Sequence, residues 1–486
     1  MKAHLQVMES APQGLVDVAV IGAGTAGLAA YRAAAAVTER VLMIEGGING
    51  TTCARVGCMP SKLLIAAGEA AYHAKHAVPF GVHATVEVDG RAVMDRVRRE
   101  RDRFVGFVLD SVESIPGEQK LRGLARFIAP GELVVNGPDG KEVRRVKARS
   151  VVIATGSSPF VPPMFEAVKD RLVVNDDVFA WETLPASVAV FGAGVIGLEL
   201  GQALSRLGVR VTLFGRSGTI GPLTDPAVKA SALAAFREEM PVYPDGNVTQ
   251  VQPAREGVEI TFVDHEGVTK VETFEYALVA AGRKANLRGI GLEHAGIHLD
   301  ARGAPVFDRT TLQCEDGSGQ GTSVFIAGDA NDDVPLLHEA ADEGKIAGEN
   351  AARYPIVNAG LRRSLLAITF TEPQIAIAGA TFASLAGSAD KDDVVVGEVS
   401  FVNQGRSRVM LQNRGVGHVY AHRTTGRFLG AELAGPRVEH IAHMLAWAHQ
   451  QELTIDTMLT MPFYHPVVEE GLRTALRDAA SKITKR

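Results

Sequence analysis

The chain has 486 residues, with 50 Lys and Arg against 56 Asp and Glu, so its formal net charge is −6. At about 100–200 residues per domain, this length predicts two to four domains. Hydrophobic residues make up 46% and charged residues 22%, which excludes a disordered, collagen-like or disulfide-caged chain. The slightly acidic balance argues against nucleic acid as a partner, and no apolar run of about 18 residues predicts a membrane span.

The N-terminus and the cysteines bear on localisation. The first residues include Lys2, Glu9 and Pro12 and no continuous apolar stretch, so they do not resemble a signal peptide. Only three cysteines are present, which is typical of a reducing compartment, and we expect a cytoplasmic protein. Two of them, Cys53 and Cys58, lie close together and need a separate explanation.

A dinucleotide-binding pattern begins near the N-terminus. The apolar run 18–21 predicts a buried strand, the Ala-rich stretch 28–36 a helix, and residues 41–44 a second strand ending at Glu45. Three glycines with G-x-G-x-x-G spacing separate the first strand from the helix: Gly22, Gly24 and Gly27. Strand, glycine turn, helix, strand and terminal acid together predict a site for a dinucleotide.

The same arrangement recurs about 170 residues further along the chain. A strand over 187–191 precedes a helix over 196–207 and a strand over 210–214. The intervening glycines have the same spacing: Gly192, Gly194 and Gly197. Two such units indicate two dinucleotide sites, the alternative being that the glycines only allow a strand and a helix to pack closely.

The remaining patterns complete an α/β architecture. Three further apolar runs predict buried strands that end at or near a glycine: 151–156, 277–282 and 324–329. A proline-rich stretch after Gly156 predicts a crossing between domains. From about Tyr354 the pattern predicts an antiparallel sheet with interleaved helices, with strands near 393–401, 416–422 and 428–433. The expected fold is two Rossmann-like domains and a C-terminal α+β domain.

Cys53 and Cys58 precede a predicted helix over 63–75, with Pro60 suited to a first helical turn. On a regular helix five residues rise about 7.5 Å, which exceeds the roughly 4.4–6.8 Å between the Cα atoms of a disulfide. The pair can therefore bond only where the backbone is distorted, which Gly57 permits. A strained pair at a helix N-terminus is easily reduced, so the spacing favours a redox-cycling disulfide.

Other readings of the cysteines are weaker. Zinc normally takes four ligands with closer spacings, and the third cysteine, Cys314, falls in a Gly/Asp-rich segment predicted to be a loop. We therefore expect no metal site and a bystander role for Cys314. Two inert buried thiols are the remaining alternative for Cys53 and Cys58.

Taken together, these motifs resemble those of the class I flavoprotein disulfide reductases, and among them the dihydrolipoamide dehydrogenases. The resemblance extends from about Val16 to the C-terminus and is most specific over Cys53–Lys62. It also includes six shorter segments: Ala154–Gly156, Gly192–Glu199, Gly282–Lys284, Ala327–Asp329, Phe370–Pro373, and His465-Pro466 with Glu470.

The resemblance implies a domain order and two cofactors. Residues 1–158 would begin the FAD domain, 159–283 would bind NAD(P), 284–355 would complete the FAD site, and 356–486 would form the dimer domain. The residues expected at FAD are Gly22, Gly24, Gly27, Glu45, Thr52, Lys62, Ala125, Thr155, Gly156 and Asp329. Those expected at the nicotinamide nucleotide are Gly192, Gly194, Val195, Gly197, Glu199, Arg216 and Gly282.

The resemblance also implies catalytic roles. Cys53 would exchange with the dithiol substrate, and Cys58 would contact the flavin. Lys62 would lie near the flavin and pair with Glu199. His465 would accept a proton from the substrate while Glu470 orients its ring. In the family this pair serves the disulfide of the other subunit, which implies a homodimer whose partner is the lipoyl domain of a multienzyme complex.

The chain departs from the family pattern at three places, one of which is Gln374, where the family has Glu. The residues around His465 are Phe463, Tyr464 and Val467. The family often has another His two residues before this histidine and usually Thr after His-Pro, so we expect the entrance of the dithiol pocket to be reshaped. At the end of the 210–214 strand, Gly215 replaces the acid of NAD enzymes and Arg216 follows, as in NADPH-using relatives. We expect NAD from the overall match, and NADP stays open.

Two alternatives to a dihydrolipoamide dehydrogenase therefore remain. One is an NADPH-dependent reductase of another small disulfide. The other is a structural subunit of a dehydrogenase complex without turnover, against which the intact set of Cys53, Cys58, His465 and Glu470 argues.

Overall fold

The computed structural model describes residues 15–389 and 391–484, which form two compact units. The first unit contains the chain up to Arg55, Asp102–Ser158 and Arg283–Arg362. The second contains Val56–Arg101, Pro159–Gly282 and the chain from Arg363. Two helices continue from one unit into the other: α2 (Thr52–Val56) and α4 (Gly90–Glu113).

The first unit is built on an eight-stranded sheet in the order β17-β18-β6-β1-β2-β3, with β5 pairing with both β4 and β6. The strands β18, β6, β1, β2 and β3 run parallel, as βαβ connections require. The bounds are β1 (Leu15–Ile21), β2 (Val41–Glu45), β3 (Lys120–Arg122), β4 (Leu124–Ala129), β5 (Glu132–Asn136), β6 (Glu142–Ile153), β17 (Gln313–Glu315) and β18 (Gly321–Ile326). A separate short pair joins β7 (Ser157–Pro159) to β16 (Arg283–Ala285).

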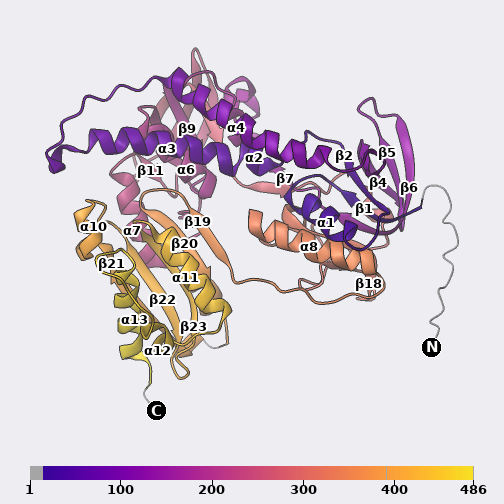
Figure 1. Cartoon of the computed structure of the whole chain (residues 1–486). Coiled ribbons are helices and arrows are strands. Elements are labelled where there is room, and N and C mark those ends of the chain that lie inside the picture. Colours follow the sequence, from indigo (N-terminus) through magenta and orange to yellow (C-terminus); the bar gives the residue numbers. More distant parts are fainter. Residues whose placement is uncertain (1–14, 390, 485–486) are drawn as a thin grey trace. The chain divides into compact units, whose positions relative to one another are not determined.

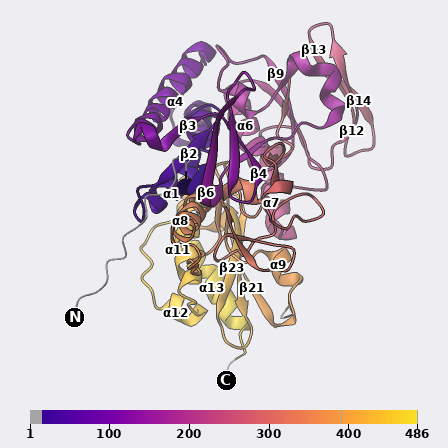
Figure 2. The ribbon, with the colours of Figure 1, turned by 90° about the vertical axis from the view of Figure 1, so that its right-hand side faces the viewer.

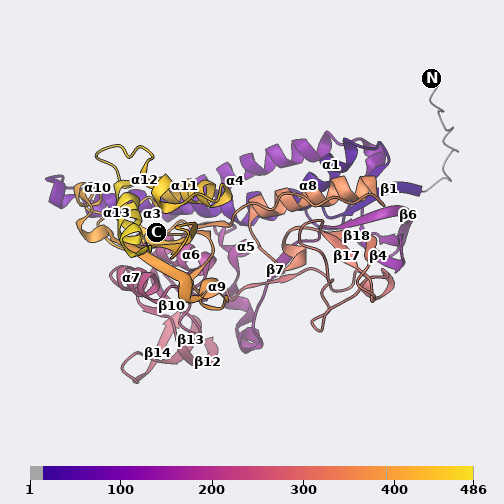
Figure 3. The same cartoon turned by 90° about the horizontal axis from the view of Figure 1, so that it is seen from below.

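Two helices pack side by side in this unit, α1 (Thr25–Ala35) and α8 (Leu337–Arg353), as Figures 1 and 3 both show. Small residues allow the close approach. A Cβ atom at Gly344 of α8 would lie 2.2 Å from the carbonyl oxygen of Ala26, and one at Gly348 would lie 2.2 Å from that of Ala30. The Ala-rich sequence of α1 therefore serves packing as well as helix formation.

The second unit contains a five-stranded sheet, all parallel, in the order β11-β10-β9-β15-β8. A three-stranded antiparallel sheet, β12-β13-β14, is visible in Figure 2. The strands are β8 (Leu172–Val173), β9 (Ser187–Phe191), β10 (Arg210–Phe214), β11 (Val242–Tyr243), β12 (Asn247–Ala254), β13 (Gly257–Val263), β14 (Thr269–Phe274) and β15 (Tyr276–Val279). The helices are α3 (Cys58–Lys75), α5 (Asn175–Val178), α6 (Val195–Arg206) and α7 (Pro226–Arg237).

The C-terminal part of this unit is an antiparallel sheet in the order β19-β20-β23-β22-β21. Its strands are β19 (Leu366–Thr369), β20 (Gln374–Gly379), β21 (Val394–Ser400), β22 (Val416–His422) and β23 (Phe428–Gly435). Helix α11 (Val438–Gln450) packs on β20 and β23, and α13 (Glu470–Lys482) packs on β21 and β22 (Figure 1). Three short helices complete it: α9 (Phe382–Ala386), α10 (Gly405–Val409) and α12 (Ile455–Leu459).

The fold class predicted from the sequence is confirmed, and three local expectations need correction. The helix expected over 63–75 begins five residues earlier, at Cys58. The strand expected over 277–282 ends at Val279, because the chain turns before Gly282, whose φ is 101°. Cys314 lies in β17 rather than in a loop, because Gln313 pairs with Phe325 of β18. Among the described residues, no helix is long and apolar enough to span a membrane.

Candidate active site

The first glycine turn joins β1 to α1 in the first unit. A Cβ atom at Gly22 would lie 2.3 Å from the carbonyl oxygen of Ala154, and one at Gly27 would lie 1.9 Å from that of Gly22. Only glycine fits these two positions. A Cβ atom at Gly24, by contrast, would meet no atom within 4 Å, so the space above it is open. This open space at the N-terminus of α1 suits a pyrophosphate.

Glu45 and Thr155 flank this turn. Glu45, at the end of β2, accepts hydrogen bonds from the backbone N–H of Ala23 (2.7 Å) and of Gly47 (2.5 Å). The hydroxyl of Thr155 is buried and has no hydrogen-bond partner among the described residues, although a buried polar group normally has one. The open cradle and this orphaned hydroxyl fit a bound FAD.

The other residues expected at FAD lie in several elements. Asp329 is half-buried and accepts a hydrogen bond from the Ser157 hydroxyl at 2.5 Å. Ala125 is buried in β4, and Thr52 is exposed in α2. Glu45, Ala125, Thr155 and Asp329 belong to the first unit, whereas Lys62 belongs to the second.

The second glycine turn, between β9 and α6, repeats the geometry of the first. A Cβ atom at Gly192 would lie 2.2 Å from the carbonyl oxygen of Ala280, and one at Gly197 would lie 1.8 Å from that of Gly192. A Cβ atom at Gly194 would again meet nothing within 4 Å, and α6 begins at the next residue, Val195. This turn therefore also leaves room for a pyrophosphate at a helix N-terminus.

The loop after β10 shows why an acid is missing there. A Cβ atom at Gly215 would lie 2.7 Å from the carbonyl oxygen of Pro244 and 3.0 Å from the Ala193 methyl group, so no carboxylate side chain fits. The next residue, Arg216, is exposed, and no partner of its guanidinium is found among the residues that the structure describes. A cation thus stands free beside the second turn.

Lys62 and Glu199 form an ion pair within the second unit. The Lys62 ammonium lies 2.9 and 2.8 Å from the two carboxylate oxygens of Glu199, whose side chain is only 4% exposed. Phe370 supports the pair: its backbone N–H donates to Glu199 at 2.9 Å, and its ring centroid lies 4.5 Å from the Lys62 ammonium. Packing of α3 on α6 brings the two helices together. The role of Phe370 was not predicted from the sequence.

The two cysteines lie on either side of a break between helices. Cys53 is half-buried in α2, and Cys58 is exposed as the first residue of α3. Gly57 between them has φ −128° and ψ −116°, outside the helical region, so the backbone does not continue as one helix. Cys58 thus lies at the N-terminus of α3, which is the positive end of the helix dipole. Cys314 is fully buried, which raises the pKa of its thiol.

His465 and Glu470 meet at the start of α13. The Nδ1 atom of His465 lies 3.1 Å from both carboxylate oxygens of Glu470, and this hydrogen bond lowers the pKa of Glu470. Donation from Nδ1 leaves Nε2 as the basic nitrogen. The His465 side chain is 81% exposed, so its reacting edge faces outward.

One departure from the family pattern acquires a structural reason. Gln374 accepts a hydrogen bond through Oε1 from the backbone N–H of Glu439, in the first turn of α11. It thereby caps that helix, and an amide oxygen performs this task as a carboxylate would.

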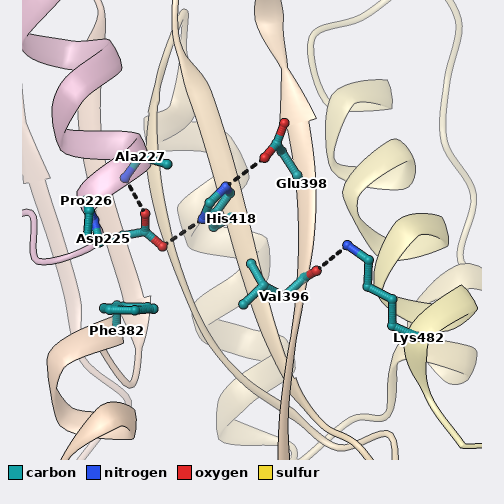
Figure 4. A pocket seen from close by; sticks show the side chains of 8 residues that line it. All are labelled: Asp225, Pro226, Ala227, Phe382, Val396, Glu398, His418 and Lys482. Atoms are coloured by element: carbon teal, nitrogen blue, oxygen red, sulfur yellow. Dashed lines mark hydrogen bonds and ion pairs between the residues drawn. The ribbon is translucent and has the colours of Figure 1, made fainter.

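A hollow of about 340 Å³ lies between the start of α7 and the C-terminal sheet (Figure 4). His418 donates from Nδ1 to Asp225 (2.7 Å) and from Nε2 to Glu398 (3.1 Å), and Lys482 donates to the carbonyl of Val396 (2.8 Å). The polar groups that line it therefore bind one another. This arrangement stabilises the contact between α7 and the sheet.

Comparison with known proteins agrees with this geometry. Residues 16–344 match the pyridine nucleotide-disulphide oxidoreductase family, and residues 366–476 match its dimerisation domain. A dihydrolipoyl dehydrogenase of Pseudomonas putida is 30% identical over 466 residues, covering 94% of this chain and 97% of that protein. A mercuric reductase of Shigella flexneri is 31% identical over 474 residues, covering 95% and 80%. The crystal structure of LpdA from Mycobacterium tuberculosis has a TM-score of 0.80 at 25% identity and covers 95% of this chain and 99% of that one.

The chain belongs to the pyridine nucleotide-disulphide oxidoreductase family, whose members are oxidoreductases that use FAD and a nicotinamide nucleotide. Dihydrolipoyl dehydrogenases and mercuric reductases are both among the relatives, so the substrate has to be argued from the residues of this chain.

Proposed function

We propose that the protein is a homodimeric dihydrolipoyl dehydrogenase that oxidises protein-bound dihydrolipoamide through Cys53 and Cys58. The observation that carries the proposal is the hydrogen-bonded pair of His465 and Glu470. A histidine with a free Nε2 and a carboxylate on Nδ1 is suited to take a proton from a thiol.

The chemistry assigned to the chain is a thiol–disulfide exchange. A substrate thiolate, formed when His465 accepts its proton, attacks Cys53 Sγ, and the Cys53–Cys58 bond breaks with Cys58 leaving as a thiolate. The second substrate thiol then displaces Cys53, so the substrate gains a disulfide and both cysteines are reduced. Bound FAD supplies the route for these two electrons to the nicotinamide. Lys62, held by Glu199, would place a positive charge near the flavin.

The homodimer is supported by exposed apolar side chains in the region that matches the dimerisation domain. Three large side chains of this region are strongly exposed: Trp447 (70%), Met461 (48%) and Tyr464 (80%). Trp447 lies three residues, almost one helical turn, after the exposed Met444 on α11, so the two share a face. Residues 366–476, which match the dimerisation domain, contain all of these side chains. A second copy of the chain would cover this apolar surface and bring His465 to the partner's cysteines.

The identity of the nucleotide admits a second candidate, an NADPH-dependent reductase of a small disulfide. The specific observation in its favour is the exclusion of an acid at Gly215 together with the exposed Arg216, whose guanidinium has no partner within residues 15–389 and 391–484. A free guanidinium suits a 2′-phosphate, whereas NAD recognition normally uses an acid at this position. The main proposal retains NAD because the relatives over the whole chain include dihydrolipoyl dehydrogenases.

Steady-state turnover tests the proposal. The purified protein should reduce NAD⁺ with free dihydrolipoamide, and the reaction should disappear in Cys53→Ser. Turnover of dihydrolipoamide with NADP⁺ alone would support the second candidate for the nucleotide. A flavin-containing protein that turns over no dithiol with either nucleotide would contradict both.

A further inference from the structure

We propose that Arg283 is a positioning residue for the flavin site, because its guanidinium holds Ser157 and the Ser157 hydroxyl holds Asp329. The inference rests on the proposed function, since Asp329 can act on FAD only if the first unit binds it. Neither Arg283 nor Ser157 was among the site residues predicted from the sequence.

The three residues form a continuous chain of hydrogen bonds within the first unit. Arg283 donates from Nε to the Ser157 hydroxyl oxygen and from Nη2 to the Ser157 carbonyl oxygen, both at 2.7 Å. The Ser157 hydroxyl in turn donates to Asp329 Oδ2 at 2.5 Å. A hydroxyl has a single proton, so accepting from Arg283 directs that proton towards Asp329. The guanidinium therefore fixes both the main chain and the side chain of Ser157.

Glu343 of α8 holds the backbone turn that carries Asp329. Asp329 lies in the 3₁₀ turn Gly328–Asn331. The buried Glu343 accepts hydrogen bonds from the Gly328 N–H (2.7 Å) and the Asn331 side-chain amide (2.8 Å). Burial raises the pKa of Glu343, and Arg362, with Nη2 2.8 Å from the other oxygen, counters this effect. The turn and the Oδ2 atom of Asp329 are thus both held, and among the described residues Oδ1 has no hydrogen bond.

The segment that begins at Arg283 also holds Thr155 and Gly156, which are likewise expected at FAD. Asn286 donates from its side-chain amide to the carbonyl oxygen of Thr155 (3.0 Å) and from its backbone N–H to that of Gly156 (2.9 Å). Thr155 is also the residue whose buried hydroxyl has no hydrogen-bond partner among the described residues. Residues 283–286 therefore connect Thr155–Gly156 with Asp329, which are far apart in the sequence.

The expected consequence is that Asp329 Oδ1 is already oriented to accept a hydrogen bond from FAD before FAD binds. When Ser157 and Arg283 hold Oδ2, the free Oδ1 has a fixed direction before the cofactor arrives, and binding costs less conformational entropy. Without the Ser157 hydroxyl, Asp329 turns freely and loses a charge-assisted hydrogen bond. Such a bond changes a binding constant by about tenfold or more.

Release of FAD from the holoenzyme in a chaotropic salt, followed by the rise in flavin fluorescence, tests the proposal. Ser157→Ala and Arg283→Lys should release FAD about tenfold faster than the wild type. Ser157→Thr keeps the hydroxyl and should release FAD as slowly as the wild type. Ser114→Ala is the matched control, because Ser114 is an exposed residue of the same unit whose hydroxyl donates to the carbonyl oxygen of Ser111 (2.8 Å). The melting temperature of each apoprotein should stay at the wild-type value.

The outcomes separate the inference from the proposed function. A wild-type protein that holds no FAD would contradict the proposed function. A wild-type protein that holds FAD while Ser157→Ala releases it at the wild-type rate would overturn the role of Arg283 and Ser157. A third outcome would also overturn it: Ser157→Ala releases FAD fast, its apoprotein melts at a lower temperature than the wild type, and Ser157→Thr shows both defects too. That pattern would show a general structural role.

Discussion

The ammonium of Lys62 binds both carboxylate oxygens of Glu199, at 2.9 and 2.8 Å, across 137 residues of sequence. The pair lies between α3, which begins at Cys58, and α6, which begins at the second glycine turn. It therefore connects the helix that begins at Cys58 with the helix at whose N-terminus we propose that the nucleotide binds.

Replacing Lys62 should slow electron transfer between the nicotinamide and the flavin. Lys62→Met removes the positive charge and leaves the buried Glu199 carboxylate with the Phe370 N–H as its one donor among the described residues. We expect the rate of flavin reduction, measured by stopped-flow absorbance, to fall by about 10²-fold, as when one electrostatic donor is removed from an active site. Lys75→Met on the same helix is the control, since Lys75 donates only to the carbonyl of Arg206, and an equal loss there would contradict the assignment.

Removing the imidazole of His465 should abolish dithiol oxidation without loss of flavin. His465→Gln cannot accept the substrate proton, so turnover with dihydrolipoamide should fall by about 10²-fold or more. His443→Gln provides the comparison, because His443 is exposed and its Nδ1 bonds only to the backbone carbonyl of Glu439 in its own helix. Turnover of the His465 variant near the wild-type rate would remove this residue from the mechanism.

The two kinds of glycine in the second turn should respond differently to a methyl group. Gly194→Ala places its Cβ in open space, so the melting temperature should hold while nucleotide affinity falls, because the pyrophosphate needs that space. Gly197→Ala forces a contact at 1.8 Å with the Gly192 carbonyl oxygen and should lower the melting temperature itself. Thermal unfolding and nucleotide titration of both variants check the difference, and two equally stable variants would refute it.

Arg216 should govern the choice of nucleotide. If its free guanidinium binds a 2′-phosphate, Arg216→Ala should raise the KM for NADPH about tenfold and leave the KM for NADH unchanged. The half-buried Lys229, which lies near Gly218 in the same region, provides a second variant for comparison. An unchanged ratio of the two KM values in Arg216→Ala would exclude this residue as the determinant.

His418 should make the stability of the second unit depend on pH. Burial alone would lower the pKa of His418, but the hydrogen bonds to Asp225 and Glu398 outweigh it and raise the pKa above its ordinary value of 6.5. A raised pKa in the folded state means that the stabilisation is fully present below about pH 6.5 and is lost as pH rises through the folded value. The melting temperature should therefore fall as the pH rises above about 6.5 through the folded-state pKa of His418, and it should fall less in His418→Gln. His440→Gln, at an exposed histidine, should keep the wild-type slope.

Local patterns in the sequence predicted the βαβ units well. The strands 187–191 and 210–214 have the predicted bounds, because a buried parallel strand is a continuous apolar run. The start of α6 lies one residue before the prediction, at Val195. The glycine spacing was informative because close contacts require two glycines in each turn: Gly27 and Gly197 meet a carbonyl of their own turn, and the first glycine of each turn meets a carbonyl from a distant part of the chain.

Features that depend on contacts distant in sequence could not be predicted. Arg283 reaches Ser157 across 126 residues, and Ser157 reaches Asp329 across 172, and no periodicity encodes such pairs. The short strand at Cys314 exists because it pairs with β18, whereas its own sequence is typical of a loop. The Lys62–Glu199 pair was expected only from the family resemblance.

Anaerobic addition of one equivalent of dihydrolipoamide, with the visible spectrum recorded, tests the central claim most directly. The account predicts a long-wavelength absorption band from a Cys58 thiolate beside the flavin in the wild type and no band in Cys58→Ser. A wild-type spectrum that does not change with dihydrolipoamide, in a protein that contains FAD, would contradict a dithiol-oxidising function.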